Sequence, residues 1–239
     1  MVSWVRDPLG RFPVRPHYQP AELDDESEAI VGRFLLERHG RVEYPLSTEE
    51  LGLLVEHHCS DVDHYADLSA EGDDVEGMTV FLPDEAPKVS ISAHLANNPR
   101  RENRLRTTLA HELAHAYFHR ALFAERFLAA SMVDRQDRSA RMVCKRDTIL
   151  GAREVDWMEW QAGYVSGAIL MPVSVLRRRV ADFCAARSLH TAVDPESGEA
   201  REMAQVVMEA FQVSRNAARV RLLKLGYLAT GRQSPSLFG

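Results

Sequence analysis

Residues 106–118 read RTTLAHELAHAYF, and this stretch decides how the rest of the sequence is interpreted. Two histidines, His111 and His115, stand among leucine, alanine and tyrosine in a pattern typical of an α-helix. On a helix, residues four positions apart lie on one face, about 40° apart around the axis. Two imidazole nitrogens on adjacent turns can bind one Zn²⁺ at about 2.0–2.1 Å. The stretch therefore predicts a helix that carries part of a zinc site.

Glu112 stands between the two histidines, directly after His111. Its offset of one position directs its carboxylate to a water held by the metal rather than to the metal itself. This is the general-base role of the glutamate in HExxH peptidases. Glu112 is accordingly the predicted catalytic residue. For the side chain that stabilises the developing oxyanion, proximity in the sequence offers Tyr117, His119 and Tyr164 as candidates.

A catalytic zinc normally has three protein ligands and one open position. Glu159, at the start of the next clear helix, is the best candidate for the third ligand, because a second helix packed on the first would bring its carboxylate to the metal. The same residue could instead form a helix cap with Asp156, three positions earlier, and the residues alone leave both interpretations open. His119, one turn beyond His115, is a rival ligand. Glu154 and Asp156 are weaker rivals, since they precede the helical pattern.

Two blocks of the sequence resemble the ImmA/IrrE metallopeptidases. Residues 106–115, RTTLAHELAH, are similar to the family signature RFTLAHELGH. Residues 159–172, EWQAGYVSGAILMP, are similar to the family segment E-x-x-A-N-x-F-A-x-x-L-L-M-P. The blocks occur in the family's order, and the resemblance covers roughly residues 45–228. An HExxH motif followed by both E-x-x-A and L-M-P is much more specific than HExxH alone.

The resemblance implies Glu159 as the third metal ligand and Zn²⁺ as the cofactor. It also implies a zincin-like α+β fold, in which a small antiparallel sheet lies against the active-site helix. Members of the family are associated with cleavage or inactivation of helix-turn-helix repressors, so the implied substrate is a regulatory protein. The sequence departs from the family pattern at three positions, where the family has Phe, Gly and Asn: Thr107, Ala114 and Gly163. The first two changes concern packing, and the third concerns hydrogen bonding near the metal.

The remaining patterns predict mostly helix with two short strands. Apolar spacing and capping signals favour helices over about residues 24–40, 47–57, 99–123, 156–170, 173–186 and 202–228. Strands are expected at Met78–Leu82 and Lys88–Ser92, and the stretch Val89–Ser92 is a candidate edge for an extended peptide. Residues 60–76 and 131–155 are expected to be loops or connections. The predicted domains are an N-terminal arm (1–20), a metallopeptidase domain (21–186), a helical lobe (187–230) and a tail (231–239).

The helical lobe resembles a short helix-turn-helix motif. The turn is expected at residues 211–214, with Ser214 capping the second helix. Residues 201–239 contain six Lys and Arg against two Glu, a local charge of +4. Nucleic-acid binding is therefore possible, but a structural or partner-docking role is favoured.

Composition and charge fit an ordinary globular protein of 239 residues with a net charge of −6, which argues against a polyanion-coating protein. The three widely spaced cysteines form neither a disulfide framework nor a CxxC zinc motif, so reduced thiols are expected. The N-terminus lacks the apolar core of a signal peptide. The most apolar stretch, residues 168–176, is interrupted by Pro172 and is too short to span a membrane. A cytoplasmic protein without a membrane partner is predicted.

Together these features predict a zinc-dependent endopeptidase that cleaves a regulatory protein such as a helix-turn-helix repressor. The alternative is a regulator that binds DNA or sequesters a repressor, with a metal site that is structural or vestigial.

Overall fold

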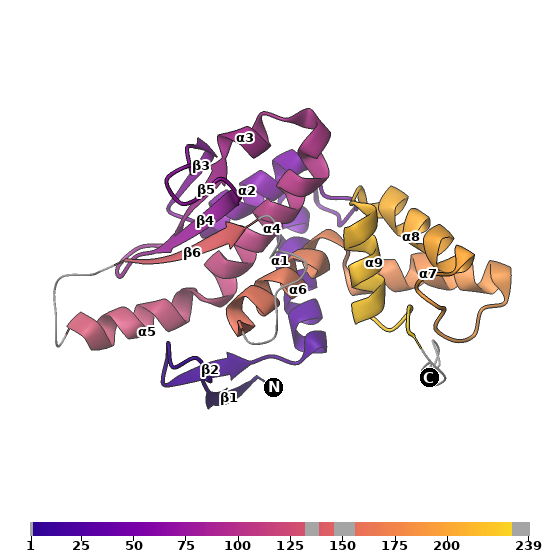
Figure 1. The fold of residues 1–239 in the computed structure, drawn as a ribbon, viewed down its shortest axis with the longest axis horizontal. Helices are drawn as coiled ribbons and strands as arrows, with labels where there is room; N and C mark the ends of the chain where they lie inside the picture. The colour runs from indigo at the N-terminus through magenta and orange to yellow at the C-terminus, as the bar shows by residue number, and fades with distance from the viewer. Residues whose placement is uncertain (1, 132–138, 146–155, 231–239) are drawn as a thin grey trace.

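The structure is a computed structural model that describes residues 2–131, 139–145 and 156–230 (Figure 1). The described elements, in chain order, are β1 (Ser3–Arg6), β2 (Val14–His17), α1 (Pro20–His39), α2 (Thr48–His58), β3 (Asp61–Ala66), β4 (Val75–Phe81), β5 (Lys88–Ser92), α3 (Ala93–Ala96), η1 (Pro99–Arg101), α4 (Glu102–Phe118), α5 (Arg120–Ser131), β6 (Ala140–Lys145), α6 (Trp157–Leu170), α7 (Val173–Arg187), α8 (Gly198–Phe211) and α9 (Arg215–Lys224). The predicted α+β class is confirmed.

Helix α4 lies at the centre of the molecule, packed against α6 and α2 and beneath the sheet. Small and apolar residues let its neighbours approach closely, and Ala110, Leu113 and Ala114 are almost completely buried. The helix is shorter than expected. It ends at Phe118, and the chain turns at His119 before continuing as the separate helix α5.

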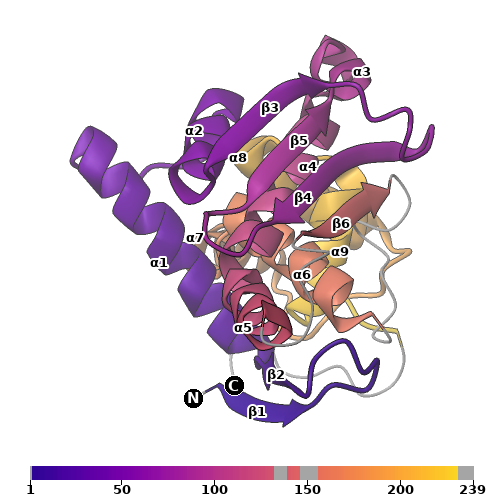
Figure 2. The same ribbon diagram turned by 90° about the vertical axis from the view of Figure 1, so that its left-hand side faces the viewer.

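The main sheet has four described strands in the order β3-β5-β4-β6 (Figure 2). Strand β4 is antiparallel to β5 and β6, whereas β3 is parallel to β5. The predicted antiparallel sheet is therefore wrong in one pairing, because the sheet is mixed. Strands β3 and β6 lie in segments predicted as loops. In β3 the residues Asp61, Asp63 and Tyr65 face solvent. The alternation of apolar and polar residues that marks a half-buried strand is therefore weak in this segment.

The position of β5 corrects another prediction. Its bounds, Lys88–Ser92, agree with the sequence pattern, but the strand lies between β3 and β4. Both of its edges are therefore occupied, and the predicted addition of a peptide along Val89–Ser92 is excluded. Among the described strands of this sheet, the terminal positions belong to β3 and β6.

The N-terminal arm contains a hairpin in which β1 pairs antiparallel with β2, so its prediction as a loop is wrong. The connection between the strands folds onto the body of the molecule. Phe12 is buried there, with its ring centroid 5.2 Å from that of Phe123 and 6.3 Å from that of Trp157. Asp7 accepts a hydrogen bond from the indole nitrogen of Trp157 at 2.9 Å. Helix α1 begins at Pro20, four residues earlier than the expected Asp24.

Helices α7, α8 and α9 form the lobe at the right of Figure 1. The predicted turn between α8 and α9 is present: Gln212 adopts the left-handed conformation and the Ser214 hydroxyl caps α9 by accepting from the Ala217 amide at 3.2 Å. Helix α7 packs on α8, so its contacts group it with the helical lobe, although the predicted boundary follows residue 186.

Two buried arginines join this lobe to the rest of the molecule. Arg106 of α4 donates hydrogen bonds to the carbonyl oxygen of Phe211 and to Gln212 Oε1, each at 3.2 Å. Arg221 of α9 donates to the Asp24 carboxylate of α1 at 2.6 Å. Both guanidinium groups are removed from water and depend on these acceptors, so the lobe is anchored from two sides.

Candidate metal centre

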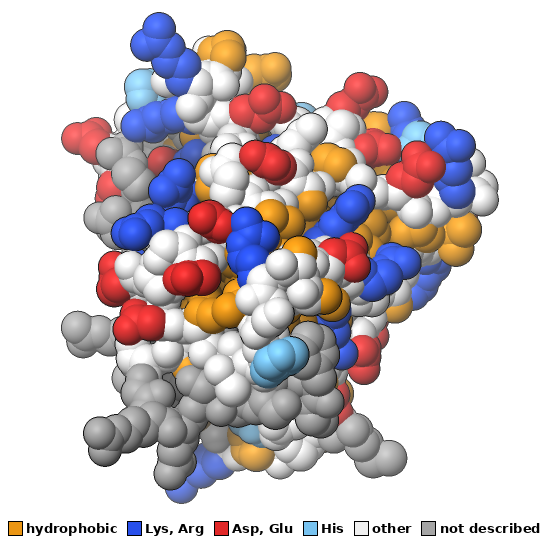
Figure 3. All heavy atoms as spheres, turned by 90° about the vertical axis from the view of Figure 1, so that its right-hand side faces the viewer, with side chains coloured by type: hydrophobic (Ala, Val, Ile, Leu, Met, Phe, Trp, Pro, Cys, Tyr) orange, Lys and Arg blue, Asp and Glu red, His pale blue; other side chains and the backbone are white. Residues whose placement is uncertain are grey.

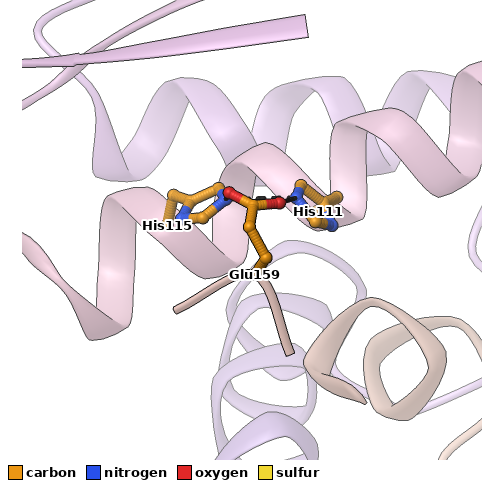
Figure 4. Close-up of side chains that lie close together, drawn as sticks. All are labelled: His111, His115 and Glu159. Carbon is orange, nitrogen blue, oxygen red and sulfur yellow. Dashed lines mark hydrogen bonds and ion pairs between the residues drawn. The ribbon is translucent and has the colours of Figure 1, made fainter. Parts of the chain in front are cut away.

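Two histidines of α4 form one side of the candidate centre. His111 and His115 lie on the helix face that is turned toward α6, and both are almost completely buried. Their Nε2 atoms are 3.1 Å apart. The predicted spacing on adjacent helical turns therefore places two ligand nitrogens side by side (Figure 4).

Glu159 comes from the first turn of α6 and reaches between the two rings (Figure 4). One carboxylate oxygen lies 3.2 Å from His111 Nε2, and the other lies 3.2 Å from His115 Nε2. The alternative interpretation, a local cap with Asp156, is not formed. Asp156 occupies the N-cap position without a side-chain cap bond and instead pairs with Arg11 at 2.7 Å.

The spacing of the two histidine nitrogens and the Glu159 carboxylate is close to that of a tetrahedral metal site. Ligand bonds of about 2.0–2.2 Å in tetrahedral geometry place neighbouring ligand atoms roughly 3.3–3.5 Å apart. Here the two Nε2 atoms are 3.1 Å apart, and each lies 3.2 Å from a different oxygen of the Glu159 carboxylate. Within the part of the chain that the structure describes, His111, His115 and Glu159 are the group of His, Cys, Asp and Glu side chains that could hold a metal ion. The rival ligand Glu154 lies outside the described residues.

The charge environment of Glu159 favours its ionised form. Burial alone would raise the pKa of its carboxyl group. The charge of His115 and the hydrogen bonds from both histidines outweigh burial and hold the pKa well below its usual range. An anionic oxygen is therefore present beside the two nitrogens at any pH where the histidines can bind a metal.

Glu112 is on the same helix, and its carboxyl group contacts strand β4. Its Oε2 accepts a hydrogen bond from the Thr79 hydroxyl at 2.6 Å. Its Oε1 is buried and accepts no hydrogen bond from a nitrogen or oxygen donor among the described residues. Burial raises the pKa of Glu112 to about 7, although the charge of His115 and the Thr79 hydroxyl oppose this shift. A carboxyl group with such a pKa can take up and release a proton near neutral pH.

Gly77 makes room for the Glu112 carboxyl group. A Cβ atom at position 77 would lie 2.9 Å from Glu112 Cδ and 2.9 Å from Thr108 Cγ2, and it would also collide with Glu112 Oε1. Because Gly77 has no side chain, strand β4 can pack closely on the Glu112 carboxyl group.

His119 does not join the donor group that faces Glu159. It lies behind His115, with 3.0 Å between the two Nδ1 atoms, and its Nε2 is 3.2 Å from Gln161 Oε1. Its ring meets that of Trp157 edge to face, with centroids 5.6 Å apart. His119 is completely buried, and burial holds its pKa well below the usual range.

The two tyrosines suggested for oxyanion stabilisation are engaged elsewhere. Tyr117 donates its hydroxyl hydrogen to Glu26 at 2.6 Å, and Tyr164 donates to Asp24 at 2.9 Å. Both partners belong to α1. The structure therefore gives neither tyrosine a contact with the candidate centre.

Sequence reasoning missed Gly77 and Thr79, which contact Glu112, and Gln161, which contacts His119. A glycine beside a predicted strand signals close approach of another group, and this signal was available at Gly77. Thr79 and Gln161 carry no such signal, because their relation to Glu112 and His119 arises only when β4 and α6 pack on α4.

The predicted reduced state of the cysteines agrees with the structure, in which all three are unpaired. Among the helices of the described residues, none combines the length and apolar character needed to cross a membrane. Comparison of the sequence with protein-family models matches no family, and comparison with curated proteins finds no significant relative. The two-block resemblance to ImmA/IrrE metallopeptidases therefore stays a prediction.

Proposed function

We propose that this protein is a zinc-dependent endopeptidase with a zincin-like fold. The observation that carries the proposal is the convergence of His111, His115 and Glu159 beside the buried carboxyl group of Glu112. Two imidazoles and a carboxylate form a donor set typical of hydrolytic zinc enzymes, and Glu112 is a neighbouring buried carboxyl group that can accept a proton.

The number of ligands supports a catalytic rather than a structural metal. Structural zinc sites are usually closed by four protein ligands, whereas catalytic sites use three and leave one position open. The described residues supply three. The side chain of Glu159 keeps 11% of its surface exposed, while those of His111 and His115 are at most 1% exposed. The open position would therefore be reached from the Glu159 side.

The roles of the protein groups follow from their positions. Bound zinc would supply Lewis-acid chemistry, which acidifies water and polarises a carbonyl group. Glu112 accepts the proton of the attacking water on Oε1 and later delivers it to the departing amine nitrogen. The Thr79 hydroxyl holds Oε2 and so orients the carboxyl group. Gly77 has no side chain, and a larger residue at this position would displace the Glu112 carboxyl group.

The substrate class in this proposal is a regulatory protein such as a helix-turn-helix repressor, which rests on the sequence resemblance alone. Strand β6 supports an extended mode of peptide binding. It is a terminal strand among the described residues and pairs with β4, the strand that contacts Glu112. An extended peptide that adds to β6 would pass beside the candidate centre.

The DNA-binding alternative gains less support. Arg221 is buried against Asp24, and Arg219 forms an ion pair with Glu196, so two of the basic residues of α9 are already engaged. Figure 3 views the face of the helical lobe and shows Lys and Arg interspersed with Asp and Glu rather than gathered in one patch. A phosphate-binding surface normally concentrates positive charge.

A peptide library tests the proposal without a known substrate. The zinc-loaded protein would be incubated with a proteome-derived peptide library, and new termini would be identified by mass spectrometry. We expect cleavage by the wild type that disappears in Glu112→Gln and after removal of zinc by a chelator. A zinc-loaded wild type that produces no more termini than Glu112→Gln would contradict the proposal.

A further inference from the structure

His119 is a buried histidine that the proposed mechanism does not use. Both of its ring nitrogens have a partner: Nδ1 faces His115 Nδ1 at 3.0 Å, and Nε2 faces Gln161 Oε1 at 3.2 Å. His119 is 0% exposed and Gln161 is 2% exposed, so neither contact competes with solvent. A buried polar pair of this kind is held by its hydrogen bonds.

The partners fix the direction of each hydrogen bond. With the Gln161 amide oriented as in the structure, Oε1 faces the ring and only accepts, so the proton of this contact belongs to His119 Nε2. A neutral imidazole with a proton on Nε2 has a lone pair on Nδ1. His119 Nδ1 is therefore the acceptor, and His115 Nδ1 must be the donor across the 3.0 Å contact between the rings.

This direction decides which nitrogen of His115 can bind a metal. The Glu159 carboxylate only accepts, so a metal bound here would take the place of the proton on His115 Nε2, while the proton on Nδ1 stays in the bond to His119. His115 Nε2 is the atom that lies 3.1 Å from His111 Nε2 and 3.2 Å from the Glu159 carboxylate. The chain from Gln161 through His119 to His115 thus selects the tautomer and the ring orientation that the donor group requires.

Helix α6 contributes to both ends of this arrangement. It carries Glu159, which faces the Nε2 atoms, and Gln161, which binds His119 from behind. Trp157, from the same helix, packs edge to face on the His119 ring at 5.6 Å. The packing of α6 on α4 therefore positions both Glu159 in the donor group and Gln161, which holds His119.

We propose that His119 is a positioning residue that accepts a hydrogen bond from His115 and thereby presents His115 Nε2 to the metal. The inference rests on the proposed metal centre and deepens it. It also explains why His119 is not itself the third ligand, since both of its nitrogens are occupied and its contact with His115 is on the side opposite Nε2.

The first test measures the tautomer of His119 in the zinc-loaded wild type by long-range proton–nitrogen NMR correlation. We expect a proton on His119 Nε2, none on His119 Nδ1, and a proton on His115 Nδ1 that is shared across the hydrogen bond. A His119 ring protonated on Nδ1 would overturn the inference. This measurement needs no substitution and is therefore independent of how variants fold.

The second test compares zinc affinity between variants by chelator competition, with circular dichroism as the check on folding. His119→Phe keeps an aromatic ring beside Trp157 but removes the acceptor, and loss of such an outer partner typically weakens metal binding about 10–100-fold. His119→Asn places an oxygen near the position of Nδ1 and should restore affinity to within about threefold of wild type. His190→Phe, at an exposed histidine, is the matched control and should not change the affinity.

The outcomes separate this inference from the proposed function. A wild type that does not bind zinc would contradict the metal centre as a whole. A wild type that binds zinc, together with a folded His119→Phe variant that binds it equally well, would contradict only the positioning role. Equal losses in His119→Phe and His119→Asn would also contradict it, because a lost acceptor should be rescued by the asparagine oxygen.

Discussion

Two carboxyl groups lie beside the same pair of histidines but in opposite environments. Glu159 reaches both Nε2 atoms at 3.2 Å, and positive charge and hydrogen bonds hold its pKa well below the usual range. Glu112 packs against β4 and accepts a hydrogen bond from Thr79, and burial raises its pKa to about 7. The same chemical group is thus held as an anion in one place and kept protonatable in the other.

This difference arises from where each residue sits on its helix. Glu112 is one position from His111, so it emerges on a different face of α4 and meets the sheet. Glu159 comes from α6 and meets the face that carries the histidines. Such a division, with one carboxylate as ligand and one as proton acceptor, is what metal-assisted hydrolysis requires.

The largest expected effect is on hydrolysis in Glu112→Gln. The amide cannot accept the proton of water, and loss of a general base typically costs about 10²–10⁴-fold in rate. Turnover of a cleaved library peptide would measure the loss, with Glu37→Gln, at an exposed position of α1, as the charge-matched control. Hydrolysis by Glu112→Gln at close to the wild-type rate would place the base elsewhere.

The second effect concerns stability against pH in the metal-free protein. The pKa of Glu112 is raised from 4.5 to about 7 in the folded state, so the folded state binds its proton more tightly than the unfolded state. The free energy of unfolding should therefore fall as pH rises from about 4.5 to 7. Relative to Glu112→Gln, the wild type should lose about 2–3 kcal/mol between pH 5 and pH 8.

Glu159 has the opposite sign and a separate window. Its lowered pKa contributes stability that is present above pH 4.5 and is lost as pH falls below that value, so it adds no slope between pH 5 and pH 8. Urea unfolding of the metal-free wild type and Glu112→Gln at these two pH values would measure the difference. A difference that does not change with pH would show that Glu112 has an ordinary pKa.

A smaller effect is expected from Gly77→Ala. The three atoms nearest to the new Cβ belong to Glu112 and Thr108, so the Glu112 carboxyl group would be displaced first. A misplaced catalytic group of this kind should lower hydrolysis about 10–100-fold while zinc affinity is retained. Gly32→Ala in α1, where a Cβ would meet nothing within 4 Å, is the matched control. Loss of zinc in Gly77→Ala would mean that the position of the Glu112 carboxyl group also affects metal binding by Glu159 and the histidines.

Much of the fold could be predicted where the pattern along the chain is strong. Strand β5 has the expected bounds, and α6 begins within one residue of the expected start. The capping box at Ser47 is formed, with Ser47 and Glu50 exchanging hydrogen bonds at 2.7 and 3.1 Å. These elements carry local signals, namely alternation in the strand and caps at the helix starts.

The missed strands show what local patterns cannot reveal. Strands β1 and β2 are four residues long and β3 exposes alternate charged or polar residues, so none has an apolar alternation to recognise. Their existence depends on pairing with β5 or with each other. A prediction from the sequence alone therefore gave too few strands.

The candidate centre divides in a similar way. The spacing of His111 and His115 on one helix was enough to predict their proximity. Glu159 required a family resemblance, since spacing alone left a cap with Asp156 open. Gln161 and Thr79 could not be predicted, because each contacts the centre only through the packing of a distant element on α4.

The most direct measurement is the zinc affinity of Glu112→Gln and Glu159→Gln, determined by chelator competition with circular dichroism to confirm folding. We expect Glu112→Gln to bind one zinc as tightly as the wild type. We expect Glu159→Gln to bind at least about tenfold more weakly, because a neutral amide is a poor substitute for an anionic oxygen ligand, with Asp156→Ala nearly unchanged as the control. A folded Glu159→Gln variant with wild-type affinity would contradict the assignment of Glu159 as ligand, and weakened binding in Glu112→Gln would contradict the separation of the two carboxyl groups.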